Sequence, residues 1–109
     1  MVKRSLDAVA GAVASAPRRS IIERLGDGDA SMSVLAAHLG VTLPAVDKHL
    51  RVLADAGVVT KHKTGRTTSV RLVPGSLDEL GTWAMSTRLM WGHALDRLEQ
   101  HLATTQGDA

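Results

Sequence analysis

Two cations and one carboxylate lie close together in the segment TLPAVDKHLRVLADAG, residues 42–57. If this segment is a helix, its period places Lys48 and Arg51 on the same outward side. Ammonium and guanidinium groups donate charged hydrogen bonds, which suit phosphate oxygens and the acceptor edge of guanine. Asp47 belongs to the same side, although phosphates should repel its carboxylate. These residue types therefore favour an anionic partner and leave Asp47 to be explained.

The segment that carries these side chains has the start and stop signals of a helix. Thr42 is a good N-cap residue, Pro44 lies in the first turn where its missing N–H is tolerated, and Gly57 follows the end. The inward side is predicted to hold Val46, Leu50 and Leu53, with Leu43 at the edge and His49 at the margin. The cations are thus placed on a helix whose other side is anchored in a core.

A shorter helix is predicted immediately before this one. In SVLAAHLG, Ser33 is the expected N-cap and Gly40 the expected stop. A single residue separates Gly40 from Thr42, and two helices joined by so tight a turn form a helix-turn-helix, predicted over residues 33–56. The preceding DGDASMS has turn chemistry followed by a two-residue extended bridge.

The residues after this motif change to the composition of strands. Residues 58–73, VVTKHKTGRTTSVRLV, are rich in Val and Thr, and Gly65 near the middle suits the positive φ of a hairpin turn. We predict a two-stranded ribbon. The side chains that it should present to phosphate groups are Lys61, Lys63, Arg66 and Thr67.

Both ends of the sequence are predicted to be amphipathic helices. The first covers residues 1–15, and the last begins after Ser76, which forms a capping box with Glu79, and continues unbroken over residues 77–103. The apolar stripe of the last helix is longer than a core of this size can cover, so a second subunit should bury the rest. The predicted dimer interface consists of Leu6, Val9, Val13, Trp83, Met90, Trp91, Leu95, Leu98 and Leu102.

Composition and charge limit the function classes. With 109 residues and 44% hydrophobic content, one modest core and hence one domain over residues 1–109 are expected. Residues 43–73 hold six basic and two acidic residues, a net charge of +4, whereas residues 77–109 have a net charge of −3. There is no cysteine, which excludes disulfides and thiolate sites and favours a cytoplasmic protein. No run approaches the roughly 20 apolar residues that span a membrane.

Three segments, PRRSIIERL, LAAHLGVTLPAVDKHLRVLADAGVV and TGRTTSVRLVP, resemble the ArsR/SmtB family of bacterial winged-helix repressors. The most specific part is PAV-x-KHL-x-VL-x-x-AG-x-V. The resemblance implies a mainly α fold with a small β-ribbon (α+β), a winged helix-turn-helix with a long C-terminal dimerisation helix. It also implies a homodimeric repressor that binds double-stranded DNA at a pseudo-palindromic operator.

The helix geometry and the resemblance together indicate a set of DNA-facing residues. These are Thr42, Leu43, Pro44, Asp47, Lys48, His49, Arg51, Lys61, Lys63, Arg66 and Thr67. The family often has serine where this chain has Asp47. Since Arg51 lies four residues from both Asp47 and Asp55, one hypothesis is that Asp47 orients Arg51 toward guanine and suppresses indiscriminate phosphate binding. The rival is that Asp47 accepts a hydrogen bond from cytosine N4. Arg18 and Arg19 are expected to contact phosphates or to be simply solvated.

Other functions receive less support from the residues. The tail resembles a branch of the family without metal-sensing motifs: His93 and Asp96 have the spacing of one ligand pair, but Leu80 and Thr82 stand where the other ligands would be. No metal or other cofactor is therefore expected. The alternatives are an atypical metal site, a small-molecule pocket beside the tryptophans and methionines of the last helix, or a winged-helix module that binds protein. No nucleophile motif, phosphate loop or carboxylate pair indicates an enzyme.

Overall fold

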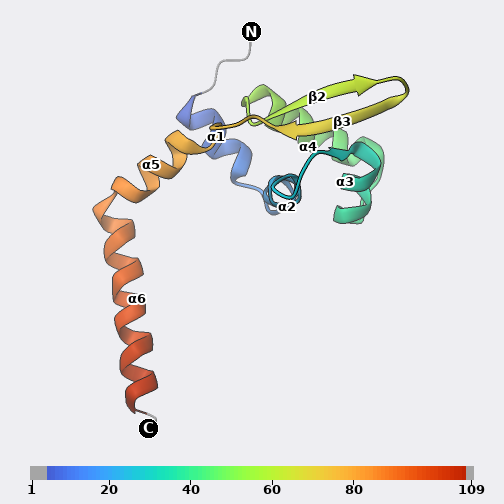
Figure 1. Cartoon of the computed structure of the whole chain (residues 1–109). Coiled ribbons are helices and arrows are strands. Elements are labelled where there is room, and N and C mark those ends of the chain that lie inside the picture. Colours follow the sequence, from blue (N-terminus) through green and yellow to red (C-terminus); the bar gives the residue numbers. More distant parts are fainter. Residues whose placement is uncertain (1–4, 108–109) are drawn as a thin grey trace. The chain divides into compact units, whose positions relative to one another are not determined.

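The computed structural model describes the backbone of residues 5–107 and the side chains of residues 5–87, 92 and 95–103. The chain forms two compact units, Met1–Leu77 and Asp78–Ala109. The first unit contains α1 (Leu6–Val13), α2 (Ala16–Leu25), β1 (Ala30–Ser31), α3 (Met32–Leu39), α4 (Leu43–Asp55), β2 (Val59–Thr64) and β3 (Thr67–Leu72). The second contains α5 (Asp78–Ser86) and α6 (Arg88–Gly107). Within the first unit, the β2–β3 hairpin projects past α3 and α4 (Figure 1).

The hydrophobic core of the first unit joins its helices to the base of the hairpin. The largest fully buried side chains are Ile21, Leu35, Val46, Leu50, Leu53, Val58, Val59 and Val70. Burying each such side chain stabilises the fold by about 1.5–3 kcal/mol. The inward side predicted for α4 is confirmed, because Val46, Leu50 and Leu53 are all completely buried. The opposite side of α4 is consequently directed away from the core.

The three strands form one antiparallel sheet in the order β1-β3-β2. The predicted hairpin is confirmed: Val59 pairs with Leu72 at its base, and Thr64 pairs with Thr67 at its tip. Gly65 has a φ of +61° in the connecting turn, a conformation in which a side chain would be strained. The sheet is larger than the predicted two-stranded ribbon, because the extended bridge before α3 becomes β1 and pairs Ala30 with Val70.

Two predicted N-caps were wrong. Ser31, not Ser33, caps α3, since the Ser31 Oγ accepts a hydrogen bond from the Val34 N–H at 3.1 Å. Pairing of Ser31 with Ser69 holds the end of β1 extended, and an extended residue is what an N-cap requires. Ser76 caps no helix. It is buried, and its Oγ donates to the carbonyl oxygen of Val58 at 3.4 Å.

The prediction of one unbroken helix over residues 77–103 was also wrong, because Thr87 belongs to neither α5 nor α6. The Ser86 Oγ donates to the Trp83 carbonyl oxygen at 2.9 Å, and the Thr87 Oγ1 donates to the Ala84 carbonyl oxygen at 3.1 Å. Hydroxyls that bond to carbonyls one turn back compete with the helical ladder. None of the helices in the described part of the chain is both long and apolar enough to cross a membrane.

The predicted fold class is confirmed. The chain is mainly helical with a small antiparallel sheet, and the order of α3, α4 and the β2–β3 hairpin is that of a winged helix-turn-helix. We call α4 the recognition helix and the β2–β3 hairpin the wing.

Candidate nucleic-acid interface

The turn between α3 and α4 fixes where the recognition helix begins. Gly40 ends α3 with a φ of +68°, and the Val41 N–H donates to the Ala36 carbonyl oxygen at 3.0 Å. Thr42 then caps α4 as predicted, since its Oγ1 accepts from the Ala45 N–H at 3.3 Å. The turn is thus closed by local hydrogen bonds, and the start of α4 is held away from the core.

The outer side of the recognition helix is exposed as the sequence predicted. Leu43 is 49% exposed at the tip, Pro44 and Lys48 behind it are exposed, and the Arg51 side chain is 74% exposed. His49 is accessible, in agreement with its predicted place at the margin of the buried side. This side therefore offers one apolar contact at its tip followed by cations.

The tip of the wing carries further donors. Lys63, Arg66 and Thr67 are exposed, and within the described part of the chain neither Lys63 nor Arg66 forms an ion pair. The same holds for Lys48 on the recognition helix. Cations on α4 and on the wing are therefore available to an anionic partner.

Asp47 differs from its neighbours because it is held between two cations. Its Oδ2 lies 3.0 Å from the Nε of Arg51, and its Oδ1 lies 2.9 Å from the Nζ of Lys61 on β2. The hydrogen bond from Lys61 is the main cause of a lowered pKa at Asp47, and the charges of Lys61 and Arg51 add to it. The predicted pairing of Asp47 with Arg51 is confirmed. The sequence did not predict the contact with Lys61.

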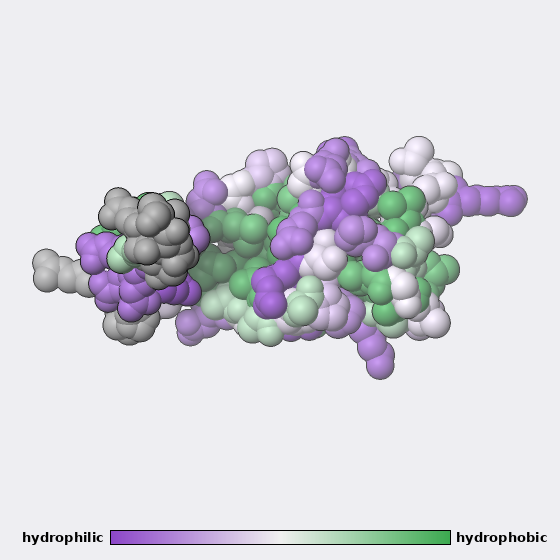
Figure 2. All heavy atoms as spheres, turned by 90° about the horizontal axis from the view of Figure 1, so that it is seen from below, coloured by the Kyte–Doolittle hydropathy of each residue, from purple (hydrophilic) through white to green (hydrophobic). Residues whose placement is uncertain are grey.

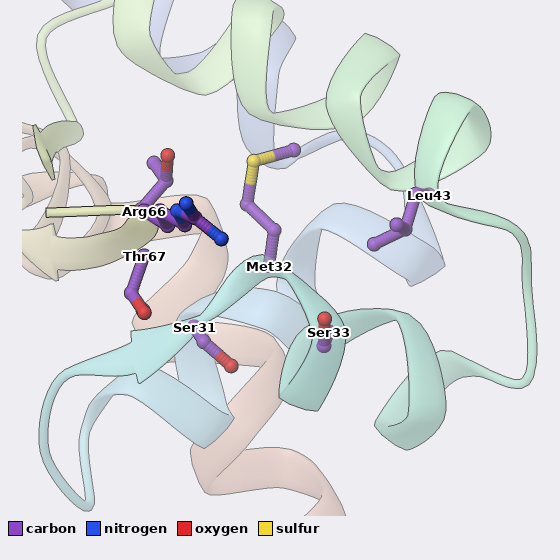
Figure 3. Close-up of a pocket in the computed structure, with 7 residues that line it drawn as sticks. Ser31, Met32, Ser33, Leu43, Arg66 and Thr67 are labelled. Atoms are coloured by element: carbon purple, nitrogen blue, oxygen red, sulfur yellow. The ribbon is translucent and has the colours of Figure 1, made fainter.

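A cleft of about 390 Å³ lies between the recognition helix, the start of α3 and the wing. Figure 3 shows Arg66 reaching toward it from the wing, Met32 and Ser33 from the start of α3, and Leu43 from the start of α4. The complete lining is Ser31, Met32, Ser33, Leu43, Arg66, Thr67 and Thr68. The cleft combines one guanidinium with several hydroxyls, a donor set that suits an oxyanion.

Sequence reasoning missed the contribution of α3 to this cleft. The hydroxyls of Ser31 and Ser33 are close together in the sequence, which is the only local signal. Their approach to Arg66 depends on the pairing of β1 with β3, which sets Ser31 opposite Ser69. Contacts between segments so far apart in the chain cannot be read from a local pattern.

Arg18 and Arg19 form contacts within the chain that the sequence did not predict. The Arg18 Nε donates to the Ala12 carbonyl oxygen at 2.6 Å, and the Arg19 Nη1 donates to the Val13 carbonyl oxygen at 2.9 Å. These carbonyls belong to the last turn of α1, where no helical N–H reaches them. The two guanidinium groups therefore cap α1.

The predicted dimer residues differ in their surroundings. Val9 is only 3% exposed and belongs to the core of the first unit, so it offers no free surface to a partner. Leu6 and Val13 are half-buried. The exposed ones are Trp83, Leu95, Leu98 and Leu102, each 49–53% exposed. The side chains of Met90 and Trp91 lie outside the described part of the structure.

The described residues contain no group of three or more histidine or acidic side chains close enough to hold a metal ion. His93, which the atypical metal site would need, lies outside the described side chains.

Of the residues considered for a small-molecule pocket, Met85 is 65% exposed. In Figure 2, hydrophobic residues lie between hydrophilic ones over the face that is shown.

Known proteins share both the sequence pattern and the fold. A family described as a helix-turn-helix domain matches residues 13–62. The HTH-type transcriptional regulator Rv2034 of Mycobacterium tuberculosis is 36% identical over 105 residues, covering 96% of this chain and 94% of that protein. The transcriptional repressor SdpR of Bacillus subtilis is 31% identical over 55 residues, covering 50% of this chain and 61% of that protein.

The structural comparison extends over most of the chain. The structure of an ArsR-like transcriptional regulator from Rhodococcus sp. RHA1 superimposes with a TM-score of 0.66 and 30% identity. The match covers 87% of this chain and 90% of the other. The chain therefore belongs to the ArsR family of winged-helix transcriptional regulators.

Proposed function

We propose that this ArsR-family regulator is a homodimeric repressor that binds a pseudo-palindromic DNA operator and acts without the metal sites of the family. The observation that carries the proposal is the outer side of the recognition helix, where Lys48 and Arg51 are exposed and Asp47 links Arg51 to Lys61 of the wing. The major groove of B-DNA admits an α-helix, and a helix-turn-helix presents the first turns of its second helix to base edges.

The tip and the outer side of α4 have different parts in this proposal. Leu43 is apolar and half-exposed, so it suits contact with a thymine methyl group. Arg51 donates hydrogen bonds that suit the O6 and N7 acceptors of guanine, and Lys48 is assigned to an adjacent phosphate. Thr42, Pro44 and the edge of His49 complete the surface that meets the groove.

The wing and the cleft are assigned to the DNA backbone. Lys63, Arg66 and Thr67 would contact phosphates, which position a protein on DNA without reading its sequence. In the cleft, Arg66 lies near the start of α3, where N–H groups of the first helical turn favour an anion. One phosphate held in this cleft would set the distance between the wing and the recognition helix.

The homodimer is supported by the apolar residues of α5 and α6. Trp83 is 49% exposed on α5, and Leu95, Leu98 and Leu102 are 50–53% exposed on α6. The three leucines recur at intervals of three and four residues, so they share one side of α6. An apolar stripe of this kind is the seam of paired helices, and the proposed occupant is the same stripe of a second copy.

Two further parts of the proposal are the sign of regulation and the absence of a metal. Similarity to the repressor SdpR favours repression. The lack of cysteine removes the thiolate ligands that metal sensing in this family often uses. A small-molecule effector is compatible with the proposal. Because bacterial chromosomal DNA lies in the cytoplasm, the proposed function is exercised there.

Selection of bound fragments from genomic DNA by the purified protein tests the proposal. The expected result is a small set of fragments that share two inverted half-sites, with centres about 10 base pairs or a multiple of that apart. Recovery of fragments without a common inverted sequence, both with and without added zinc, would contradict it.

A further inference from the structure

The carboxylate of Asp47 forms an ion pair with one cation on each of the two elements that are proposed to bind DNA. Its Oδ2 contacts Arg51 one turn further along the recognition helix, and its Oδ1 contacts Lys61 on the wing. We propose that Asp47 is a positioning residue that determines specificity: it ties the wing to the recognition helix and withholds Arg51 and Lys61 from indiscriminate phosphate binding. This inference rests on the proposed DNA-binding function and deepens it.

The contact with Arg51 leaves the end of the guanidinium available for a base. Asp47 engages the Nε at 3.0 Å, and the Arg51 side chain is 74% exposed. The two Nη groups provide parallel N–H donors that match the O6 and N7 acceptors of guanine. The carboxylate therefore restricts the rotamers of Arg51 and offsets its charge toward phosphates, while the Nη groups can still donate to a base.

The contact with Lys61 has a different consequence. The side chain of Lys61 is 32% exposed and that of Asp47 is 27% exposed, so the ion pair is partly shielded at the junction of β2 and α4. A phosphate at an arbitrary DNA site must compete with Asp47 for this ammonium group.

The geometry also disfavours the rival role of Asp47 as a direct acceptor from cytosine. Each carboxylate oxygen already accepts from a cation of this chain. The Lys61 hydrogen bond, together with the charges of Lys61 and Arg51, lowers the pKa of Asp47, as expected for a carboxylate that accepts from two cations. Direct recognition of cytosine would require Asp47 to share or release at least one of them.

The decisive comparison is Asp47→Asn against Asp55→Asn. Asp55 lies on the same helix and is exposed, and it forms no ion pair among the described residues. Both variants remove one negative charge, but only the first releases two cations. For the dimer, we expect Asp47→Asn to tighten binding to a random-sequence duplex about threefold to tenfold. It should steepen the slope of log affinity against log salt by about 2 to 4, because roughly one unit accompanies each phosphate neutralised.

With the selected operator, Asp47→Asn should tighten binding less than it does with the random-sequence duplex. The ratio of operator affinity to random-duplex affinity should therefore fall in Asp47→Asn. In Asp55→Asn this ratio should stay within about twofold of the wild-type ratio. In a Lys61→Met background, the effect of Asp47→Asn on random-duplex affinity should shrink, whereas that of Asp55→Asn should not. The inference would be overturned if the two aspartate variants changed random-duplex affinity equally. It would also be overturned if the effects of Asp47→Asn and Lys61→Met on this affinity were additive in the double variant.

A measurement without DNA separates this inference from the proposed function. In the free protein, Asp47→Asn should change the NMR resonance of the Lys61 ammonium and speed amide exchange in β2, whereas Asp55→Asn should leave both unchanged. If the wild type shows this linkage but binds no duplex, the proposed function fails and takes the specificity role with it. If the wild type binds duplex but the linkage is absent, the inference alone fails.

Discussion

The ammonium group of Lys61 lies 2.9 Å from the Oδ1 of Asp47, although 14 positions of sequence separate the two residues. Lys61 belongs to β2 and Asp47 to α4, so this ion pair joins the wing to the recognition helix. Asp47 also contacts Arg51, its neighbour one helical turn away. The cations assigned to bases and to phosphates are therefore linked through one carboxylate.

The first prediction concerns pH. The pKa of Asp47 is lowered from its ordinary value of 3.8, so the stabilisation by its ion pairs is complete above that value and is lost as the pH falls through the lowered pKa. Carboxyl NMR should place the Asp47 midpoint below 3.8, and Lys61→Met should move it upward. A wild-type midpoint at or above 3.8 would contradict the ion pairs.

The second prediction concerns the N-cap of the recognition helix. Thr42→Ala removes the acceptor of the Ala45 N–H and should lower the free energy of unfolding by about 1 kcal/mol, as measured by urea denaturation. Thr42→Ser keeps a hydroxyl and is the matched control, with a loss below about 0.5 kcal/mol. Equal losses in both variants would show that the methyl group, not the cap, is responsible.

The third prediction concerns the cleft. Arg66→Ala should flatten the salt dependence of DNA binding by about one unit per subunit, because each phosphate contact releases about 0.9 of a counterion. Arg71→Ala is the control: it removes the same charge from the same hairpin, but Arg71 is already paired with Asp29 at 2.9 Å. The cleft assignment is wrong if the two variants change the slope equally.

The fourth prediction concerns the dimer. Leu98→Glu places a charge in the apolar stripe of α6 and should convert the protein to a monomer in sedimentation at micromolar concentration. Val34→Glu is the matched control, since Val34 is similarly exposed at 43% but lies on α3. A wild type that sediments as a monomer, or a Leu98→Glu variant that stays dimeric, would contradict the proposed interface.

The local parts of the fold could be predicted from the sequence. Thr42 as cap, Gly40 as stop and Gly65 in the hairpin turn all follow from the conformational preferences of single residues. The pairing of Asp47 with Arg51 follows from helical spacing alone. These features depend on residues no more than four positions apart, which is why a local pattern suffices.

The features that depend on distant segments could not be predicted. Both Ser31 and Ser33 are good N-caps, and pairing of β1 with β3 decides in favour of Ser31. The contact of Lys61 with Asp47 likewise depends on how the wing leaves the core.

The break at Thr87 is a different case, because its cause is local: the Thr87 hydroxyl bonds back to Ala84. The regular spacing of apolar residues over 77–103 nevertheless predicted a continuous helix.

The central claim, that α4 and the wing bind DNA, is tested most directly by the affinity for operator duplex as a function of salt. Lys48, Lys63 and Arg66 form no ion pair within the described part of the chain, and a dimer presents each of them twice. We predict a slope of log affinity against log salt of about −5. A slope near zero, or no binding to any duplex at low salt, would contradict the claim.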